Sequence, residues 1–129
     1  MKLSDLDSRE LANKGAKCRI YNPKTGEQTG ASITMLGADS TVYKAKTKEI
    51  AERRRLEGKA MTQEQAEEDS REILAACATG WEGITDDDGK SLPFNEANIR
   101  AALDVPEVYR QLGEFAMRRA NFLPSASAS

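Results

Sequence analysis

Residues 17–36, KCRIYNPKTGEQTGASITML, indicate a β-hairpin, because their apolar side chains alternate with polar ones on both sides of an NPKTG turn. The alternating apolar residues are Cys18, Ile20, Ile33 and Met35. Proline fixes φ in the turn, and glycine accepts a positive φ. The pattern predicts two antiparallel strands, at about 17–22 and 31–36. A lone hairpin is marginal in water, so its apolar face must lie on helices or on another chain's sheet.

Sequence signals on either side of the hairpin predict helices. A short helix is expected at 4–13 and is ended by Gly15. A second helix is expected to start at Asp39 or Ser40 and to end at Gly58. Its apolar residues are few, so either it lies on the surface or a partner completes its apolar face.

A third helix has a stronger start, since Thr62 and Gln65 form a capping box. Its apolar face is spaced to continue through Trp81. The members of that face are Ala66, Ser70, Ile73, Leu74, Cys77 and Trp81. The DDDGKSLP stretch then breaks the helical pattern.

The end of the chain predicts a short helix followed by a longer one. Asn95 caps the first of them, and Asp104 and Glu107 form a second capping box. Pro106 falls in the first turn of the longer helix, where its missing N–H costs nothing. The apolar face of that helix consists of Val105, Val108, Tyr109, Leu112, Phe115, Ala116 and Phe122.

Together these signals predict an α+β protein in which a short N-terminal helix and a β-hairpin precede a bundle of about four helices. We expect a single domain over 1–123, with the hairpin at about 17–36 and the helical part at about 39–123. The PSASAS end, residues 124–129, is too small and polar to order itself and is expected to be disordered.

Residues 80–99, GWEGITDDDGKSLPFNEANI, invite two functional interpretations. The GKS triplet lacks the glycine that a phosphate-binding loop needs five positions earlier, and Leu92-Pro93 follows where that loop needs a helix. The aspartates do not have EF-hand spacing. We therefore expect an acidic turn whose two ends are held to the core by Trp81 and Phe94, with the tryptophan N–H bonded to a backbone carbonyl. An exposed binding anchor is the alternative for the tryptophan.

Charge is nearly balanced, with 19 basic and 21 acidic side chains, but it is uneven along the chain. Segment 39–59 has seven basic against four acidic residues, and segment 62–72 has one against five. The two segments can attract each other, or two copies of the chain can. Glutamates interrupt the basic run, and Glu49 is spaced to pair with Arg53, so the run favours a solvated helix over nucleic-acid binding. Docking to an acidic protein surface remains open.

The chain has no histidine, and its two cysteines, Cys18 and Cys77, match no zinc-ligand spacing. Acid–base catalysis would need a carboxylate or lysine with a strongly shifted pKa, so we expect no enzyme, no catalytic residue, no metal and no cofactor. The start of the chain lacks the apolar core of a signal peptide, and no apolar run of about 18 residues occurs. We expect a soluble cytoplasmic protein with reduced cysteines and no membrane partner.

Self-association is expected through the hairpin edge or the last helix, because the amphipathic helices have more apolar surface than one hairpin can cover. The residues chosen for partner contact are Tyr109, Leu112, Phe115 and Phe122. The alternative that the same four residues form the protein's own core stays open, and periodicity favours it.

Two stretches resemble the tail assembly chaperones of long-tailed bacteriophages. The first is NPKTGEQTGASITMLGADSTVYK, a strand, a turn and a strand before a Gly-x-Asp-Ser helix start. The second is ATGWEGITDDDGKSLPFNEANIRAALDVPEVYRQLGEFA, in which Gly-Trp, an acidic Asp-Gly turn, Pro-Phe and an Asn-capped helix follow in the order such proteins have. The two stretches cover most of residues 17–122.

The resemblance implies a non-enzymatic protein made in the cytoplasm of the bacterial host. Such a chaperone binds the tape measure protein, keeps its long hydrophobic helices soluble and helps recruit tail tube subunits. Chaperones of this type are usually absent from the finished virion, and many also exist as a longer frameshifted form. The alternative is a structural tail or head–tail component that stays in the particle.

Overall fold

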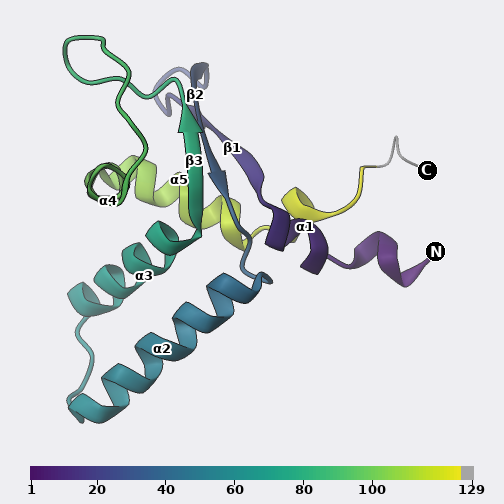
Figure 1. Cartoon of the computed structure of the whole chain (residues 1–129), viewed down its shortest axis with the longest axis vertical. Helices are drawn as coiled ribbons and strands as arrows, with labels where there is room; N and C mark the ends of the chain where they lie inside the picture. Colours follow the sequence, from purple (N-terminus) through teal and green to yellow (C-terminus); the bar gives the residue numbers. More distant parts are fainter. Residues whose placement is uncertain (126–129) are drawn as a thin grey trace.

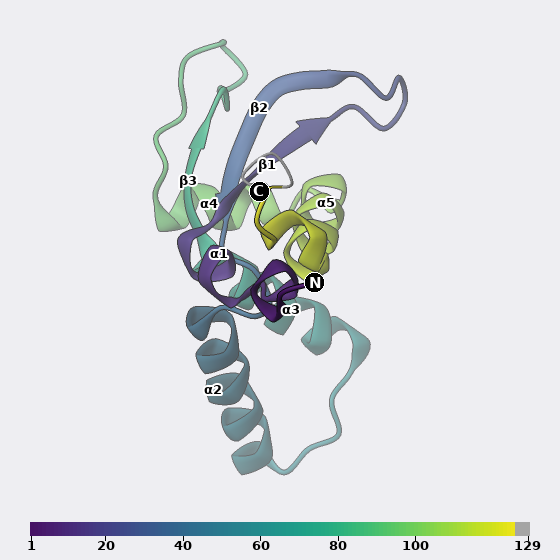
Figure 2. The same cartoon turned by 90° about the vertical axis from the view of Figure 1, so that its right-hand side faces the viewer.

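The computed structural model describes residues 1–125, which contain a three-stranded sheet, five α-helices and two 3₁₀ turns (Figures 1 and 2). In chain order these elements are η1 (Leu3–Leu6), α1 (Arg9–Lys14), β1 (Ala16–Tyr21), β2 (Gln28–Met35), α2 (Thr41–Glu57), α3 (Gln63–Cys77), β3 (Ala78–Glu82), α4 (Glu96–Leu103), α5 (Pro106–Met117) and η2 (Arg119–Phe122). The predicted α+β class is confirmed. Four residues of the tail expected to be disordered, 126–129, lie outside the described residues.

The β-hairpin forms at the predicted turn. Gly26 has a φ of 76°, and its N–H donates to the carbonyl of Asn22 at 2.7 Å. The second strand starts earlier than predicted, because Gln28 pairs with Tyr21 in the antiparallel ladder of β1 and β2. The N-terminal region also differs from the prediction. Where one helix was expected at 4–13, the structure has a 3₁₀ turn, η1, followed by a short helix, α1.

A third strand replaces the predicted end of the third helix. Helix α3 ends at Cys77, and Trp81 lies in β3, so the expected continuation of the helical face was wrong. β3 pairs antiparallel with β2, with Ile33 opposite Trp81 and Thr34 opposite Gly80. The backbone bonds to β2 make the extended conformation more stable here than another helical turn.

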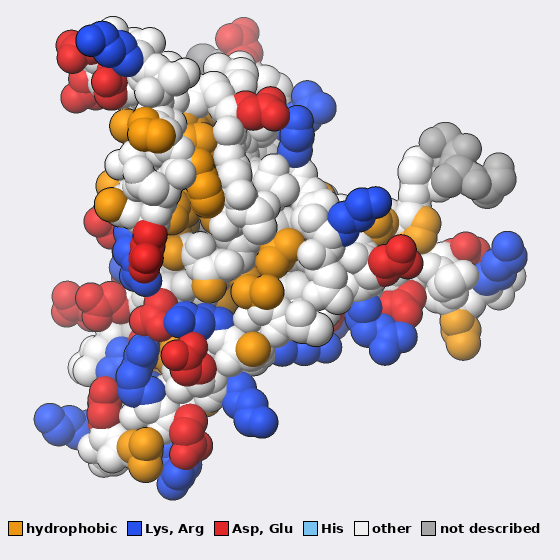
Figure 3. Space-filling model, viewed as in Figure 1, with side chains coloured by type: hydrophobic (Ala, Val, Ile, Leu, Met, Phe, Trp, Pro, Cys, Tyr) orange, Lys and Arg blue, Asp and Glu red, His pale blue; other side chains and the backbone are white. Residues whose placement is uncertain are grey.

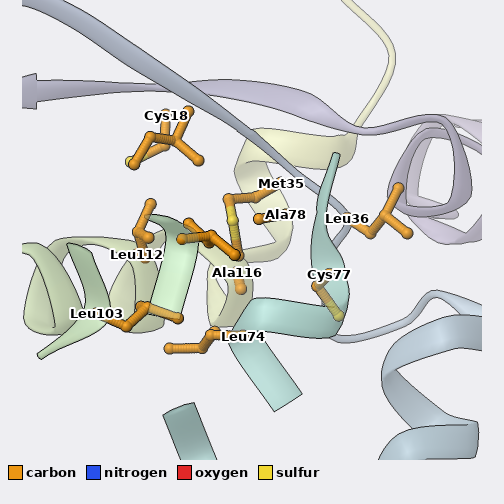
Figure 4. Packing of buried hydrophobic residues seen from close by; sticks show 11 residues of the cluster. Cys18, Met35, Leu36, Leu74, Cys77, Ala78, Leu103, Leu112 and Ala116 are labelled. Atoms are coloured by element: carbon orange, nitrogen blue, oxygen red, sulfur yellow. The ribbon is translucent and has the colours of Figure 1, made fainter. Parts of the chain in front are cut away.

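One face of the sheet packs on α3, α4 and α5, and Figure 4 shows side chains from both layers pointing toward one another. The buried apolar residues of this core are Cys18, Ile33, Met35, Leu36, Leu74, Cys77, Ala78, Ile99, Leu103, Leu112 and Ala116. The opposite face is polar, and Lys17 and Glu82 form an ion pair across it at 3.1 Å. The sheet is therefore apolar on one side only, as expected for an antiparallel sheet with a single helical layer.

The C-terminal helix is shorter than predicted. α5 ends at Met117, and Phe122 lies beyond it in η2, where its ring is 1% exposed and meets the ring of Phe115 edge-on at 5.6 Å. The capping box expected at the start of this helix was wrong, because Asp104 ends α4 and Val105 is the N-cap of α5. The position of proline in the first turn is confirmed.

Helices α2 and α3 form an antiparallel hairpin that projects from the rest of the molecule (Figure 1). Its predicted caps are confirmed: the Ser40 hydroxyl accepts from the Tyr43 N–H at 3.1 Å, and Gly58 ends α2 with a φ of 65°. Thr62 and Gln65 form the reciprocal capping box, with distances of 3.1 and 3.0 Å. Ile50 is the one buried residue of α2.

Ion pairs join the two helices of this hairpin. The guanidinium of Arg54 donates to both oxygens of Asp69, at 2.9 and 2.7 Å, and Arg53 lies 3.0 Å from Glu72. The attraction expected between segments 39–59 and 62–72 is thus confirmed within one chain. The predicted pair of Glu49 with Arg53 was wrong, since the glutamate contacts Lys46 instead, at 3.0 Å.

Candidate partner-binding groove

The four residues predicted to contact a partner do not share one exposed surface. Leu112 is 0% exposed and Phe122 is 1% exposed, so both lie in the core. Tyr109 is half-buried beneath the guanidinium of Arg71, which lies 4.8 Å from the ring centre. Phe115 is also half-buried and lines a small hollow of about 190 Å³ between β1 and α5. Of the four residues, Tyr109 and Phe115 are therefore the two whose side chains remain partly accessible to a partner.

A groove of about 300 Å³ lies between α3, the start of β3 and α4, and α2 contributes to its rim. Its floor is apolar and combines the small side chains of three alanines, Ala75, Ala76 and Ala78, with the larger side chains of Phe94 and Ile99. Its rim carries charges of both signs, on Lys46, Glu72, Glu96 and Arg100. Figure 3 shows hydrophobic side chains gathered over β3 and the region of α4, with charged groups beside them. We call this feature the α3–α4 groove.

The segment between β3 and α4 shapes one wall of the groove. The Trp81 indole N–H donates to the carbonyl of Leu92 at 2.8 Å, and its ring meets Phe94 edge-on at 5.2 Å. Asn95 then caps α4 by accepting from the Asn98 N–H at 2.8 Å. The predicted role of the two aromatic rings, which hold both ends of the crossover loop, is confirmed. Because each end is fixed, the phenylalanine is held in place at the groove.

The acidic turn lies away from the groove. One carboxylate oxygen of Asp86 accepts from the N–H groups of Asp88 and Lys90, each at 2.9 Å, and Gly89 has a φ of 80°. The GKS triplet therefore belongs to a turn, as predicted. Among residues 1–125 there is no group of three or more acidic, cysteine or histidine side chains arranged to hold a metal ion.

The rim of the groove keeps both signs of charge near neutral pH. The hydrogen bond from Arg53, followed by that from Lys46, lowers the pKa of Glu72 below its usual range. On the opposite rim Arg100 lies 3.3 Å from Glu96. An incoming chain therefore meets an apolar floor between two ion pairs.

Both cysteines are buried and free. Desolvation raises the pKa of the Cys18 and Cys77 thiols to about 11, so both stay protonated near neutral pH. Their role within the described residues is packing in the core.

The groove was not predicted from the sequence, because it forms only when residues 78–82 adopt the strand β3, and these residues were expected to continue the third helix. Thr79 and Trp81 are residue types enriched in strands, and Gly80 between them disfavours a helix interior. These three residues were the available signal. The helical spacing of the preceding apolar residues outweighed it in the prediction.

No helix within residues 1–125 is long and apolar enough to cross a membrane. Comparisons with known proteins add one positive finding. The family model of the YdaY prophage protein matches residues 39–128, more than half of the chain. No curated protein and no solved structure matches. The chain therefore belongs to the YdaY prophage protein family and is phage-derived.

Proposed function

We propose that this protein is a phage tail assembly chaperone that binds the tape measure protein, keeps it soluble and helps recruit tail tube subunits. The observation that carries the proposal is the α3–α4 groove on a phage-derived chain. The likeness of residues 22–44 and 78–116 to such chaperones supports it. In this proposal the protein is not an enzyme and needs no cofactor.

The α3–α4 groove suits an amphipathic helix of the client. The small side chains of Ala75, Ala76 and Ala78 allow a helix to approach closely, and Phe94 and Ile99 offer apolar contact. The Glu96–Arg100 pair on the rim is exposed, and such pairs contribute little to stability. Its members can therefore exchange partners with charges that flank an apolar client segment.

Co-expression with a fragment of the tape measure protein tests the proposal. The fragment should move from the insoluble to the soluble fraction, and it should co-elute with the chaperone in size exclusion with light scattering. Ala76→Arg should abolish this effect because it fills the groove from an exposed helical position. Ala51→Arg, at an exposed position of α2 that does not line the groove, is the matched control. Folded chaperone in excess over an insoluble fragment would refute the proposal.

The same proposal places the protein in the host cytoplasm, as a homo-oligomer that is absent from the mature virion and binds neither nucleic acid nor membrane. Mass spectrometry of purified particles tests its absence from the virion. Phosphate contacts are strongest at low salt, so retention on DNA or RNA at about 50 mM salt would contradict the proposal that the protein does not bind nucleic acid.

A structural component of the particle is the second candidate, and one observation favours it. Within residues 1–125, β3 is an outer strand of the sheet and β2 is its single strand neighbour. The other outer strand is partly covered, since the Gln111 side chain donates to the Tyr21 carbonyl at 2.9 Å and accepts from its N–H at 3.1 Å. An open edge can add a strand from another subunit. Stoichiometric amounts of the protein in purified particles would favour this candidate over the chaperone.

A further inference from the structure

The N-terminal segment, residues 1–7, carries two leucine side chains that are largely exposed among the described residues. Leu3 is 82% exposed and Leu6 is 59% exposed. Both belong to η1, and side chains three residues apart in a 3₁₀ turn lie on the same side. Figure 3 shows a hydrophobic side chain projecting from this segment. The segment thus presents a short apolar face to its surroundings.

The N-terminal segment is anchored at its C-terminal end, where Ser8 follows. Within it the backbone hydrogen bonds are local, from Asp5 to Lys2 and from Asp7 to Ser4. Three of its residues, Ser4, Asp5 and Asp7, line a hollow together with Pro124 and Ser125. Directly after the segment, the Ser8 hydroxyl donates to the carboxylate of Asp39. The segment can therefore move to another surface with its own two backbone hydrogen bonds intact, while Ser8 stays bound to Asp39.

We propose that the N-terminal segment of one copy docks in the α3–α4 groove of a second copy. Leu3 and Leu6 would enter the apolar floor. Lys2 would face the exposed carboxylate of Glu96, and Asp5 would face Arg100. The groove and the segment thus match in polarity and in the alternation of charge.

The occupant is a second copy because the groove of the same chain is out of reach. Figure 1 places the N-terminus and α4 on opposite sides of the molecule, with the sheet and α1 between them. Docking is consequently head-to-tail, which adds copies one after another unless a ring closes. The contact is small compared with the interface of a permanent dimer, so self-association is weak and is detected only at high protein concentration.

The contact also regulates the groove, and this part rests on the proposed function. A client helix and the N-terminal segment of a neighbour compete for one site, so client binding releases copies from one another. Removing the apolar side chains of the segment should then lower the apparent Kd for a tape measure fragment by relieving that competition.

Sedimentation and light scattering of the whole chain, from about 10 µM to about 1 mM, test the self-association. The average mass should rise with concentration for the wild type. Leu3→Ser/Leu6→Ser and, separately, Ala76→Arg should each remain monomeric, because the first removes the docking segment and the second fills the groove. Leu56→Ser, which removes an exposed leucine of α2, should associate like the wild type. Circular dichroism confirms folding of each variant.

Mixing the two defective variants is the decisive step. One retains its groove and the other retains its N-terminal segment, so equal amounts should form dimers that cannot extend. A mixture that stays monomeric overturns the proposal, as does a wild type that is monomeric throughout or a Leu3→Ser/Leu6→Ser variant that still associates. A peptide of residues 1–8 should also dissociate the wild-type assemblies, whereas the same peptide with both leucines replaced by serine should not.

These measurements contain no client, which separates the two proposals. Self-association that follows the predicted pattern, with no effect on fragment solubility, refutes the chaperone function and leaves the docking intact. Fragment solubility that depends on the groove, in a protein that never self-associates, does the reverse.

Discussion

The core and the far half of the α2–α3 hairpin hold their helices together by different forces. In the core, α3, α4 and α5 bury leucine, isoleucine and alanine side chains against the sheet. Within residues 51–69 of the hairpin, Asp69 has the one buried side chain, and it is bound by Arg54. Helix pairing by charge therefore needs few apolar residues but depends strongly on pH and on screening by salt, whereas apolar packing is not weakened by such screening.

Two leucines measure the difference most directly. Leu112→Ala in α5 should lower the free energy of unfolding by about 2–5 kcal/mol, because the side chain is fully buried and its removal leaves a cavity. Leu56→Ala in α2 should change it by less than about 0.5 kcal/mol, since that side chain is 73% exposed. Urea unfolding measures both. Equal effects would show that the hairpin end is packed as tightly as the core.

Two glycines sharpen the description of the core. A Cβ added at Gly37 would lie 2.9 Å from the ring of Phe122 and 3.0 Å from the Cβ of Ala12, so Gly37→Ala should destabilise by about 1–3 kcal/mol. Gly113→Ala should instead stabilise by about 0.5–1 kcal/mol, because it lies in α5 and its new Cβ would meet Leu74 at an ordinary 3.8 Å. Thermal and urea unfolding would reveal effects of opposite sign. A harmless Gly37→Ala would mean that the Phe122 ring can move aside.

Trp81→Phe tests the edge of the core beside the α3–α4 groove. The change keeps an aromatic ring near Phe94 but removes the indole N–H that binds the Leu92 carbonyl. We expect a loss of about 1 kcal/mol in unfolding free energy, the typical value of one hydrogen bond. Hydrogen exchange should also become faster in residues 83–94. Unchanged exchange there would show that the crossover loop is held without this bond.

Acid should open the hairpin before it affects the core. Hydrogen bonds from Arg54 lower the pKa of Asp69, and those from Arg53 lower the pKa of Glu72. Both carboxylates are therefore ionised and stabilising above their unfolded pKa of about 4, and this contribution is lost as pH falls through the lower folded pKa values. Amide exchange in residues 58–69 should increase below about pH 4 while core amides stay protected. Salt at about 1 M should act in the same direction at neutral pH.

Local chemistry was predicted well because it involves neighbouring residues. The turn at Gly26, the caps at Ser40, Thr62 and Asn95, and the left-handed Gly58 all depend on side chains and φ values within a few positions. The attraction between a basic and an acidic segment also followed from composition, although its individual pairs did not. For the candidate site, the sequence indicated the two aromatic rings beside the groove and not the groove itself.

The amino-acid pattern alone was enough to predict the α+β class, the hairpin, and where most helices begin. The tertiary structure alone decided that residues 78–82 form a strand, that Phe122 lies outside α5, and that α3, β3 and α4 meet around an apolar groove. The physical reason is that a cap or a turn is satisfied by its own neighbours. A strand edge, a buried ring and a groove are stabilised by partners far along the chain, which spacing in one segment does not specify.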